Sequence, residues 1–351
     1  MVFKSTISIF SIALILCPFT IKSASESEQR CHDGISWGVS LRQGRRPTME
    51  DTFAAQTPFK GSSDKAFFGI YDGHGGDMVA KAVAEGKGMM KSLHATLAEC
   101  NKESVVDRLK HAFLKTEESI SLHCDESGAT AAAVYIDRQT NTVTVAWAGD
   151  TRVLFVCGNS LYTTTDHKPT NEIDRIKSAG GSISSKDNTY AGYLCNTYGQ
   201  PRLAVSRSLG DKKYKYGGDY AQLKGLVADP EIAQAKFTGS DNVFLIIASD
   251  GIWDGIPNSS AAKIVAKKLN VDASVVTPKL VSTAPQYYED GNHGAAQLAA
   301  RTLGDIAFKC GSKDNISVLV AVINTCKDTP FATEFTSESP LYLKSDDNIE
   351  E

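Results

Sequence analysis

The sequence predicts an α+β fold in which antiparallel sheets lie between outer helices. Several short segments are rich in β-branched and aromatic residues, and most are separated by turns and not by helices, which is typical of antiparallel strands. Four longer stretches repeat their apolar residues with a helical period. Because sheets and helices must each bury an apolar face, sheets in the middle with helices outside are the expected packing.

The predicted elements follow one another without a break in composition. The predicted strands are Ser36–Leu41, Ala66–Tyr71, Thr130–Ile136, Thr142–Trp147, Val153–Val156, Val243–Ala248 and Ile316–Ile323. The predicted helices are Gly76–Glu99, Glu103–His123, Ser259–Lys268 and Gly294–Phe308. Residues 182–202 are rich in Ser, Asn, Gly and Tyr without a clear period, and we expect a long surface excursion there. One continuous domain at 34–324 is therefore predicted, followed by a polar, acidic tail at 327–351 that we expect to be disordered.

Length, composition and charge are those of a globular protein. The chain has 351 residues, of which 42% are hydrophobic and 22% are charged. Its formal net charge of -4 provides no basic surface for a phosphate polymer. Nucleic acid is therefore not an expected partner.

The N-terminus has the layout of a signal peptide. Lys4 precedes an apolar run from Ile7 to Phe19, and the small residues Ser23 and Ser25 offer a cleavage point. A signal peptide at 1–25 predicts entry into the secretory pathway, secretion, and no membrane contact after cleavage. The alternative is an uncleaved anchor that holds the protein on a membrane, and N-terminal sequencing distinguishes the two. Delivery to another cell is a further hypothesis.

The eight cysteines do not indicate a metal or redox site. No pair has CxxC spacing, and once Cys17 is assigned to the apolar run the remaining number is odd. Cys157 and Cys310 lie in apolar sequence, where a cysteine is usually a small buried hydrophobe.

Three aspartates lie at the ends of apolar segments that are far apart in the chain. Asp72 and Asp250 each follow a predicted strand, and Asp314 precedes one. A charge at the edge of a core is costly unless it is compensated, and one shared cation site would compensate all three. Carboxylate, carbonyl and water oxygens suit Mg²⁺ or Mn²⁺ and not Zn²⁺. The alternative for a single Asp-Gly pair is an ordinary turn.

These aspartates belong to a series of short motifs that resembles the PP2C family of protein phosphatases, also called PPM. In chain order the motifs are RPTMED at 46–51, DGHGG at 72–76, SGATA at 127–131, AGDTR at 148–152, DHKP at 166–169, LAVSRSLGD at 203–211, SDGIWD at 249–254 and DNIS at 314–317. The resemblance runs from about Gly34 to Ile323. It implies a four-layer α-β-β-α sandwich, in which two antiparallel sheets are flanked by helices, with a flap subdomain at about 168–210.

The resemblance also implies the activity and the metal ligands. The expected reaction is hydrolysis of phosphoserine and phosphothreonine in proteins by a monomeric enzyme that uses two Mg²⁺ or Mn²⁺ ions, without a phosphoenzyme. Two such cations activate a water and neutralise phosphoryl charge. The expected ligands are Asp72, which bridges the metals, the Gly73 carbonyl, Asp250 and Asp314, with Glu50 and Asp51 holding metal-bound waters.

By the same resemblance, Arg46 grips the phosphate and His74 is the general acid that protonates the departing oxygen. Positions Asp150, Asp254 and Thr130 correspond to a third, weaker metal site. The alternative there is a turn at 150–152 with a local ion pair.

Two other functions remain open. One is a pseudophosphatase that keeps the fold as a binding module, and the other is a hydrolase of a small phosphomonoester. The flap looks longer than usual, and its residues Tyr190, Tyr193, Tyr198 and Arg202 either shape substrate choice or form a simple surface excursion.

Overall fold

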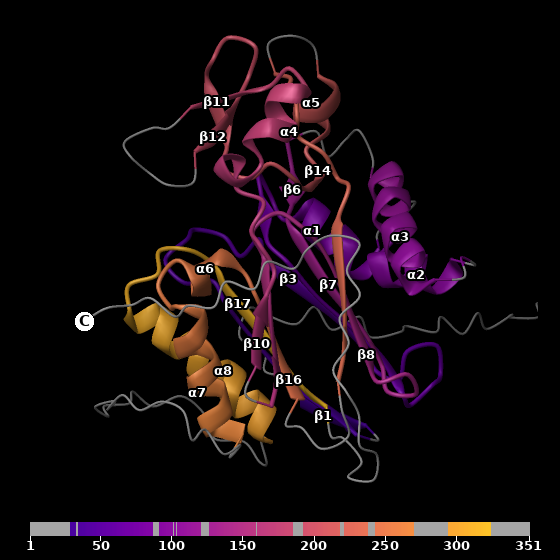
Figure 1. The fold of residues 1–351 in the computed structure, drawn as a ribbon. Helices are drawn as coiled ribbons and strands as arrows, with labels where there is room; N and C mark the ends of the chain where they lie inside the picture. The colour runs from indigo at the N-terminus through magenta and orange to yellow at the C-terminus, as the bar shows by residue number, and fades with distance from the viewer. Residues whose placement is uncertain are drawn as a thin grey trace, which may run out of the picture.

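A computed structural model places the predicted strands in two antiparallel sheets that pack face to face (Figure 1). It describes residues 29–323, except 33, 87–90, 101, 103, 121–125, 159, 185–191, 218–220, 238–242 and 270–293. The predicted signal peptide and the predicted acidic tail lie outside the described residues. Among the helices that are described, not one is both long and apolar enough to cross a membrane.

The first sheet has six strands in the order β1-β2-β17-β16-β9-β10. Their bounds are β1 Gln29–His32, β2 Ile35–Arg42, β17 Ile316–Ile323, β16 Val243–Ala248, β9 Arg152–Cys157 and β10 Ser160–Thr163. The second sheet has five strands in the order β15-β8-β7-β4-β3. Their bounds are β15 Glu231–Lys236, β8 Thr142–Ala148, β7 Ala131–Asp137, β4 Lys65–Tyr71 and β3 Thr52–Gln56.

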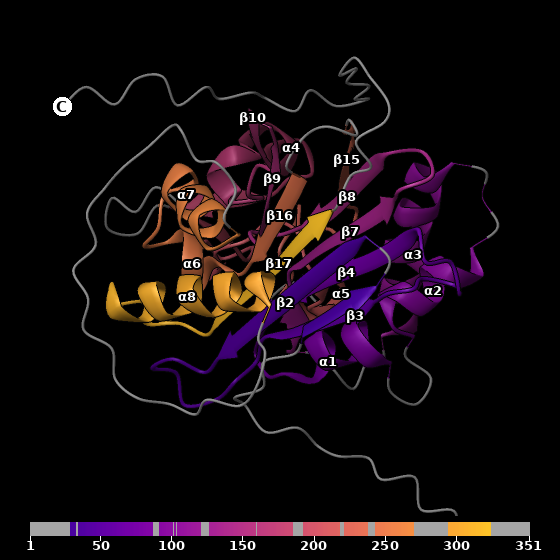
Figure 2. The ribbon, with the colours of Figure 1, turned by 90° about the horizontal axis from the view of Figure 1, so that it is seen from below.

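Helices cover the outer face of each sheet, which gives the four layers that the resemblance implied (Figure 2). The helices on the second sheet are α1 Met78–Glu85, α2 Leu93–Glu99 and α3 Val105–Ser119. Those on the first sheet are α6 Asp250–Trp253, α7 Asn258–Leu269 and α8 Ala295–Lys309. The N-cap residue of α3 is Ser104, whose hydroxyl accepts a hydrogen bond from the Asp107 backbone N–H at 3.0 Å.

The central strands are apolar throughout because both of their faces are buried. In β16, Val243, Leu245 and Ile247 point into the core between the two sheets. Phe244 and Ile246 point to the other side, where they pack against the helices of the first sheet. An alternating pattern would leave one face polar, so a continuous apolar run is the expected signature of such a strand.

One predicted helix is wrong in extent. The stretch 76–99 contains two helices, because α1 ends at Glu85 and is followed by Gly86 with φ of 80°. This left-handed φ is unfavourable for residues other than glycine, and it turns the chain out of the helix. Cys310 is also not buried as expected, because it lies exposed at the C-terminal end of α8.

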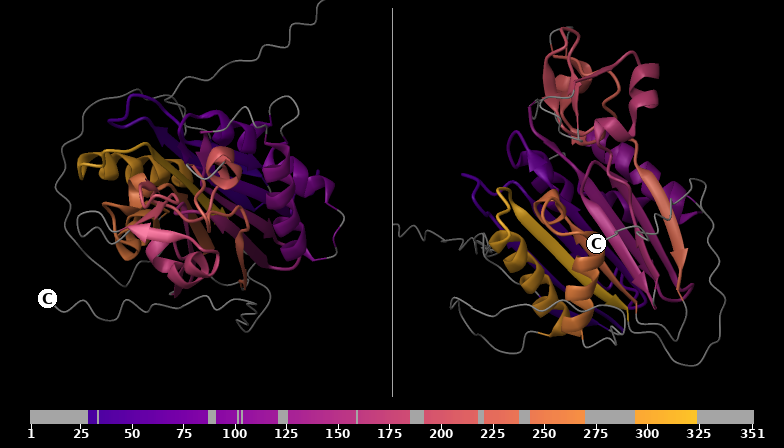
Figure 3. Two further views of the ribbon diagram at one scale, coloured as in Figure 1. Left: turned by 90° about the horizontal axis from the view of Figure 1, so that it is seen from above. Right: turned by 60° about the vertical axis from the view of Figure 1, so that its left-hand side comes forward.

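The flap projects beyond the sandwich at one end (Figure 3, right). It contains a 3₁₀ helix at Pro169–Asn171, α4 Ile173–Ser178, and a small antiparallel sheet of β11 Ser182–Ser184, β12 Tyr193–Cys195 and β13 Pro201–Leu203. The surface excursion expected at residues 182–202 therefore contains three short strands. Tyr190 lies outside the described residues.

A third small sheet joins the flap to the sandwich. It consists of β5 Gly73–His74, β6 Gly128–Ala129 and β14 Leu209–Gly210, and α5 Lys212–Tyr216 follows directly after it. Residues from three motifs that are far apart in sequence are thereby brought side by side.

We expect Leu245→Ala to lower the free energy of unfolding by about 2 to 5 kcal/mol, because it leaves a cavity between the sheets where Leu245 is 0% exposed. The matched control is Leu298→Ala on α8, where the side chain is 45% exposed, and its cost should stay under about 0.5 kcal/mol. Denaturant unfolding followed by circular dichroism measures both values. Equal midpoints for the two variants would contradict the assignment of the inter-sheet core.

Candidate active site

The three strand-end aspartates meet at one end of the sandwich. β16 and β17 pair antiparallel with Ala248 opposite Val318, so the end of β16 lies beside the start of β17. Asp250, just after β16, and Asp314, just before β17, therefore face the same cleft, and Asp72 reaches it from the end of β4. The cleft has a volume of about 360 Å³. Arg46, Glu50, Gly73, His74, Thr130 and Asp150 also line it.

Asn315 holds the loop that carries Arg46 and Glu50. Its side-chain amide donates to the carbonyls of Gln43 at 2.8 Å and Thr48 at 2.9 Å. Its side-chain oxygen accepts from the backbone N–H of Glu50 at 2.8 Å. Asn315, which is next to the predicted metal ligand Asp314, thus fixes the loop of Arg46 and Glu50 relative to that aspartate. Asn315 belongs to the DNIS motif, but its role depends on contacts with residues more than 260 positions away.

Close backbone approach explains the glycine at position 73. A Cβ atom added there would lie 2.4 Å from the Glu50 carbonyl oxygen, well inside van der Waals contact. Any side chain would push the two predicted ligand segments apart. The Asp72 carbonyl is fixed in turn by the Thr130 backbone N–H at 2.9 Å.

Carboxylates crowd the floor of the cleft. Oxygen atoms of Asp72, Asp150 and Asp250 lie within 4.8 Å of one another. Burial, and then repulsion from neighbouring carboxylates, raises the pKa of Asp72 well above its usual range. Burial likewise raises the pKa of Asp250, with Asp150 as the next cause. The pKa of Asp51 rises to about 6, mainly through burial, although Ser249 donates a hydrogen bond to it at 2.9 Å.

This donor set fits a divalent metal. The atoms that crowd together are oxygens, and the carboxylates are desolvated and repel one another. Hard cations such as Mg²⁺ or Mn²⁺ prefer such ligands and would relieve the repulsion.

The residues expected at a third metal position are placed differently from one another. Asp150 lies with Asp72 and Asp250, and its carboxylate accepts a hydrogen bond from the Lys168 ammonium. Burial opposes the charge on Lys168, but the attraction of Asp150 prevails and raises the pKa of that lysine. Asp254, by contrast, is exposed. The hydroxyl of Thr130 is already hydrogen-bonded, because it lies 2.5 Å from the Thr151 hydroxyl. Lys168 was not predicted as a site residue, although it belongs to the DHKP motif.

The two predicted catalytic side chains, Arg46 and His74, both line the cleft. The Arg46 guanidinium is 55% exposed and contacts the Asp314 carboxylate at 2.5 Å. The ring of His74 is 27% exposed, and its Nε2 lies 2.8 Å from Oδ2 of Asp211. Burial alone would lower the pKa of His74, but Asp211 outweighs it and the pKa is raised. Asp211 was not predicted to belong to the site.

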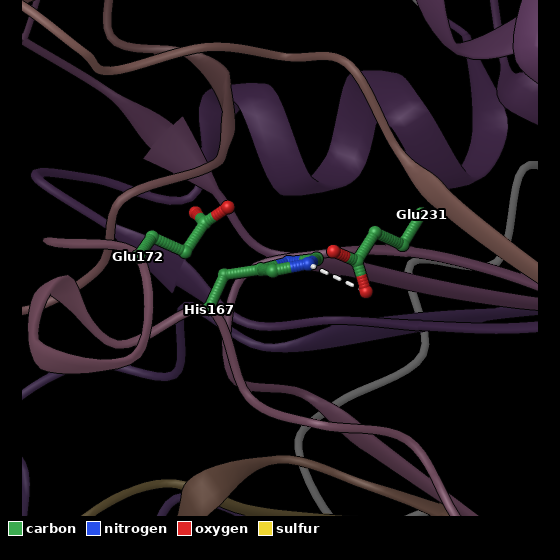
Figure 4. A group of neighbouring side chains, drawn as sticks. All are labelled: His167, Glu172 and Glu231. Carbon is green, nitrogen blue, oxygen red and sulfur yellow. Dashed lines mark ion pairs between the residues drawn. The ribbon is translucent and has the colours of Figure 1, made fainter. Parts of the chain in front are cut away.

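A second group of acidic residues and a histidine lies away from the cleft. Figure 4 shows His167 between Glu172 and Glu231, with its Nε2 3.5 Å from the Glu231 carboxylate. The Arg207 guanidinium already bridges the two glutamates, at 2.5 Å from Glu172 and 3.1 Å from Glu231. Arg175 contacts Glu172 at 2.6 Å as well.

These arginines supply the charge that a metal would otherwise provide. Burial opposes the ionisation of Glu172, but hydrogen bonds from Arg175 and Arg207 lower its pKa. The group therefore links the flap residue Glu172 to Glu231 of β15 as an ion-pair network, and we assign it a structural role.

Comparisons with known proteins agree with the fold and the motifs. The sequence model of the family "Protein phosphatase 2C" matches residues 35–316. "Probable protein phosphatase 2C 14" of Arabidopsis thaliana is 30% identical to the chain, and the match covers 84% of this chain and 74% of the plant protein. "Protein phosphatase 1A" of Bos taurus is also 30% identical, with 92% of this chain and 80% of the bovine protein covered.

A solved structure extends the agreement to the architecture. The serine-threonine phosphatase 2C from Toxoplasma gondii superposes with a TM-score of 0.65 at 19% identity, covering 85% of this chain and 99% of that one. At that identity the likeness concerns the fold. The sequence matches and the cluster of acidic residues carry the function, and together they establish that the chain belongs to the protein phosphatase 2C family of metal-dependent protein serine/threonine phosphatases.

Proposed function

We propose that this phosphatase removes phosphate from phosphoserine and phosphothreonine with the help of two divalent cations, Mg²⁺ or Mn²⁺. The observation that supports the proposal most strongly is the convergence of Asp72, Asp250 and Asp314 on one cleft from the ends of three strands. Those residues, with the Gly73 carbonyl, are the proposed direct ligands. Glu50 and Asp51 are proposed to complete the surrounding set of oxygens.

Bound cations would supply a water nucleophile that is reactive at neutral pH and would offset phosphoryl charge. The protein positions the other groups. Glu50 is held by hydrogen bonds from the Thr48 hydroxyl at 2.9 Å and the Gly76 backbone N–H at 3.1 Å. Asp51 is held by the Ser249 hydroxyl. Fixed carboxylates lose little freedom when a cation binds, which favours binding.

Arg46 and His74 are proposed to act on the substrate itself. The Arg46 guanidinium lies at the rim, where its planar set of donors can hold two phosphoryl oxygens. His74 is proposed to give a proton to the seryl or threonyl oxygen as the P–O bond breaks. The apolar residues Leu203, Ala204 and Val205 of the flap line the same cleft, where the peptide around the phosphorylated residue would pass.

A third metal bound through Asp150 would compete with the Lys168 ammonium for that carboxylate. We therefore propose that two metals suffice for turnover and that the third position stays weak. Titration calorimetry with Mn²⁺ tests this, because three sites of equal affinity would contradict it.

We expect Asp72→Ala and Asp250→Ala each to lower Mn²⁺-dependent hydrolysis of a phosphothreonine peptide by more than about 100-fold, since loss of residues that only support a metal site already costs about 10- to 100-fold. Asp174→Ala, at an exposed aspartate of α4, is the matched control and should retain the activity.

Two outcomes of this assay favour the other functions. Hydrolysis of small phosphomonoesters without hydrolysis of the peptide would favour a metabolite hydrolase. Mn²⁺ binding without hydrolysis of either substrate would favour a binding module.

The metal-free protein should lose stability as the pH rises from about 4 through 6. Unfolded aspartate has a pKa of about 3.9, whereas the folded pKa of Asp51 is about 6 and those of Asp72 and Asp250 are also raised above their usual range. The folded state therefore binds more protons in this window, and the stability that it gains at low pH is lost as these groups ionise.

Thermal unfolding in EDTA between pH 4 and 8 measures this loss. Mn²⁺ at 100 times its Kd should restore about 2.7 kcal/mol at pH 7.5. Asp250→Asn should show a shallower fall with pH than the wild type. Equal pH slopes for the two proteins would argue against crowded carboxylates in the cleft.

A further inference from the structure

Asp211 lies behind His74, on the side away from the cleft. Its side chain is 0% exposed, whereas that of His74 is 27% exposed and lines the cleft. Oδ2 of Asp211 lies 2.8 Å from Nε2 of His74. The carboxylate is therefore placed to contact the ring without contacting the substrate.

The carboxylate of Asp211 is held independently of His74. The Ser208 hydroxyl donates to Oδ2 at 2.5 Å, and the Asp211 backbone N–H donates to the Ser127 carbonyl at 2.9 Å. The backbone at Asp211 has φ of 52°, a left-handed conformation that is uncommon outside glycine and that persists only where the surroundings impose it. Its carbonyl accepts from the backbone N–H of Tyr214 at 2.9 Å. The aspartate is thus a rigid anchor.

The two oxygens of the Asp211 carboxylate differ in their hydrogen bonding. Oδ2 takes part in both hydrogen bonds, whereas Oδ1 is buried and has no hydrogen-bond partner among the described residues. A buried acceptor without a hydrogen-bond partner destabilises the folded state, so a purely structural role does not explain an aspartate at this position.

Buried lysines balance the charge of Asp211. Lys212 and Lys215 each place an ammonium 3.0 Å from Oε1 of Glu117, and Lys215 also donates to the Ser208 carbonyl at 2.7 Å. Two ammonium groups share one glutamate carboxylate in this cluster, which leaves one positive charge to compensate Asp211.

The small sheet is shaped so that Asp211 and His74 can meet. Gly128 of β6 pairs with His74 of β5 on one side and with Gly210 of β14 on the other. A Cβ atom at position 128 would lie 2.2 Å from Oδ2 of Asp211 and 2.4 Å from Nε2 of His74. The glycine of the SGATA motif therefore leaves the space in which the two side chains touch.

We propose that Asp211 is a positioning residue for the dephosphorylation reaction. Its carboxylate accepts a hydrogen bond from Nε2–H of His74 and thereby aims Nδ1 of the ring at the cleft. The inference rests on the proposed role of His74 as proton donor. A carboxylate behind an imidazole fixes both its orientation and the nitrogen that carries the proton.

In the proposed reaction, the ring of His74 begins with a proton on each nitrogen. Nδ1–H gives its proton to the seryl or threonyl oxygen as the P–O bond to that oxygen breaks. The attacking water forms the new P–O bond and releases a proton to solvent. Solvent then returns a proton to Nδ1, and Nε2–H remains bonded to Asp211 throughout.

The test compares Asp211→Asn with wild type, both loaded with Mn²⁺, on two substrates. The leaving oxygen of a phosphothreonine peptide needs a proton, whereas that of p-nitrophenyl phosphate departs without one. General acid catalysis contributes about 10²- to 10⁴-fold, so kcat on the peptide should fall by about 100-fold or more with KM unchanged. The rate on p-nitrophenyl phosphate should stay within about threefold.

Two further variants separate positioning from folding. Ser208→Ala removes only the hydroxyl that holds the carboxylate, and it should show the same selectivity between substrates to a smaller extent. Asp229→Asn, at an aspartate whose carboxylate lies 3.6 Å from the Lys110 ammonium at the surface, is the matched control and should change neither rate.

A double-mutant cycle tests whether Asp211 acts through His74. Adding Asp211→Asn to His74→Gln should cost nothing further on the peptide. Equal losses on both substrates in Asp211→Asn and Ser208→Ala, or additive losses in the double variant, would overturn the inference. A wild-type protein inactive on both substrates would instead overturn the proposed function.

Discussion

Negative charge is concentrated in the cleft at one end of the sandwich, and the rest of the site depends on how that charge is compensated. Asp72, Asp150 and Asp250 bring carboxylate oxygens within 4.8 Å of one another in a partly buried cleft. Burial and mutual repulsion both oppose ionisation there. Lys168 and Arg46 each meet one of the surrounding carboxylates. Divalent cations would compensate the others and would turn an unfavourable arrangement into a reactive one.

The sandwich can tolerate this crowding of carboxylates because the strands that carry them are rigidly held. β16 and β17 lie in the middle of their sheet and are buried on both faces, so the ends that carry Asp250 and Asp314 have little freedom. Asn315 then ties the loop of Glu50 to the same strand. The same logic extends to the flap, where Arg207 bridges Glu172 and Glu231. Fixed geometry of this kind is what placement of a phosphoryl group requires.

Much of this could be predicted from the sequence, and the failures have physical causes. The central strands are predictable because burial on both faces gives them continuous apolar runs. The aspartates of the proposed metal site are predictable from their places at strand ends and from the family motifs. β15 was missed because its sequence EIAQAK mixes polar and small residues at a sheet edge. Asn315, Lys168 and Asp211 belong to recognised motifs, but what each one does depends on partners that only the fold brings near. Asp211 and His74, for example, are 137 positions apart.

The proposed mechanism requires that aspartates from separate strand ends hold a pair of cations in one cleft. Crystals grown with Mn²⁺ and measured at the manganese absorption edge test it most directly. We expect two anomalous peaks about 3.5 to 4 Å apart, with Asp72 between them and Asp250 and Asp314 among the ligands. A cleft without peaks in crystals of the folded protein, or manganese bound only at the group of His167, Glu172 and Glu231, would contradict it.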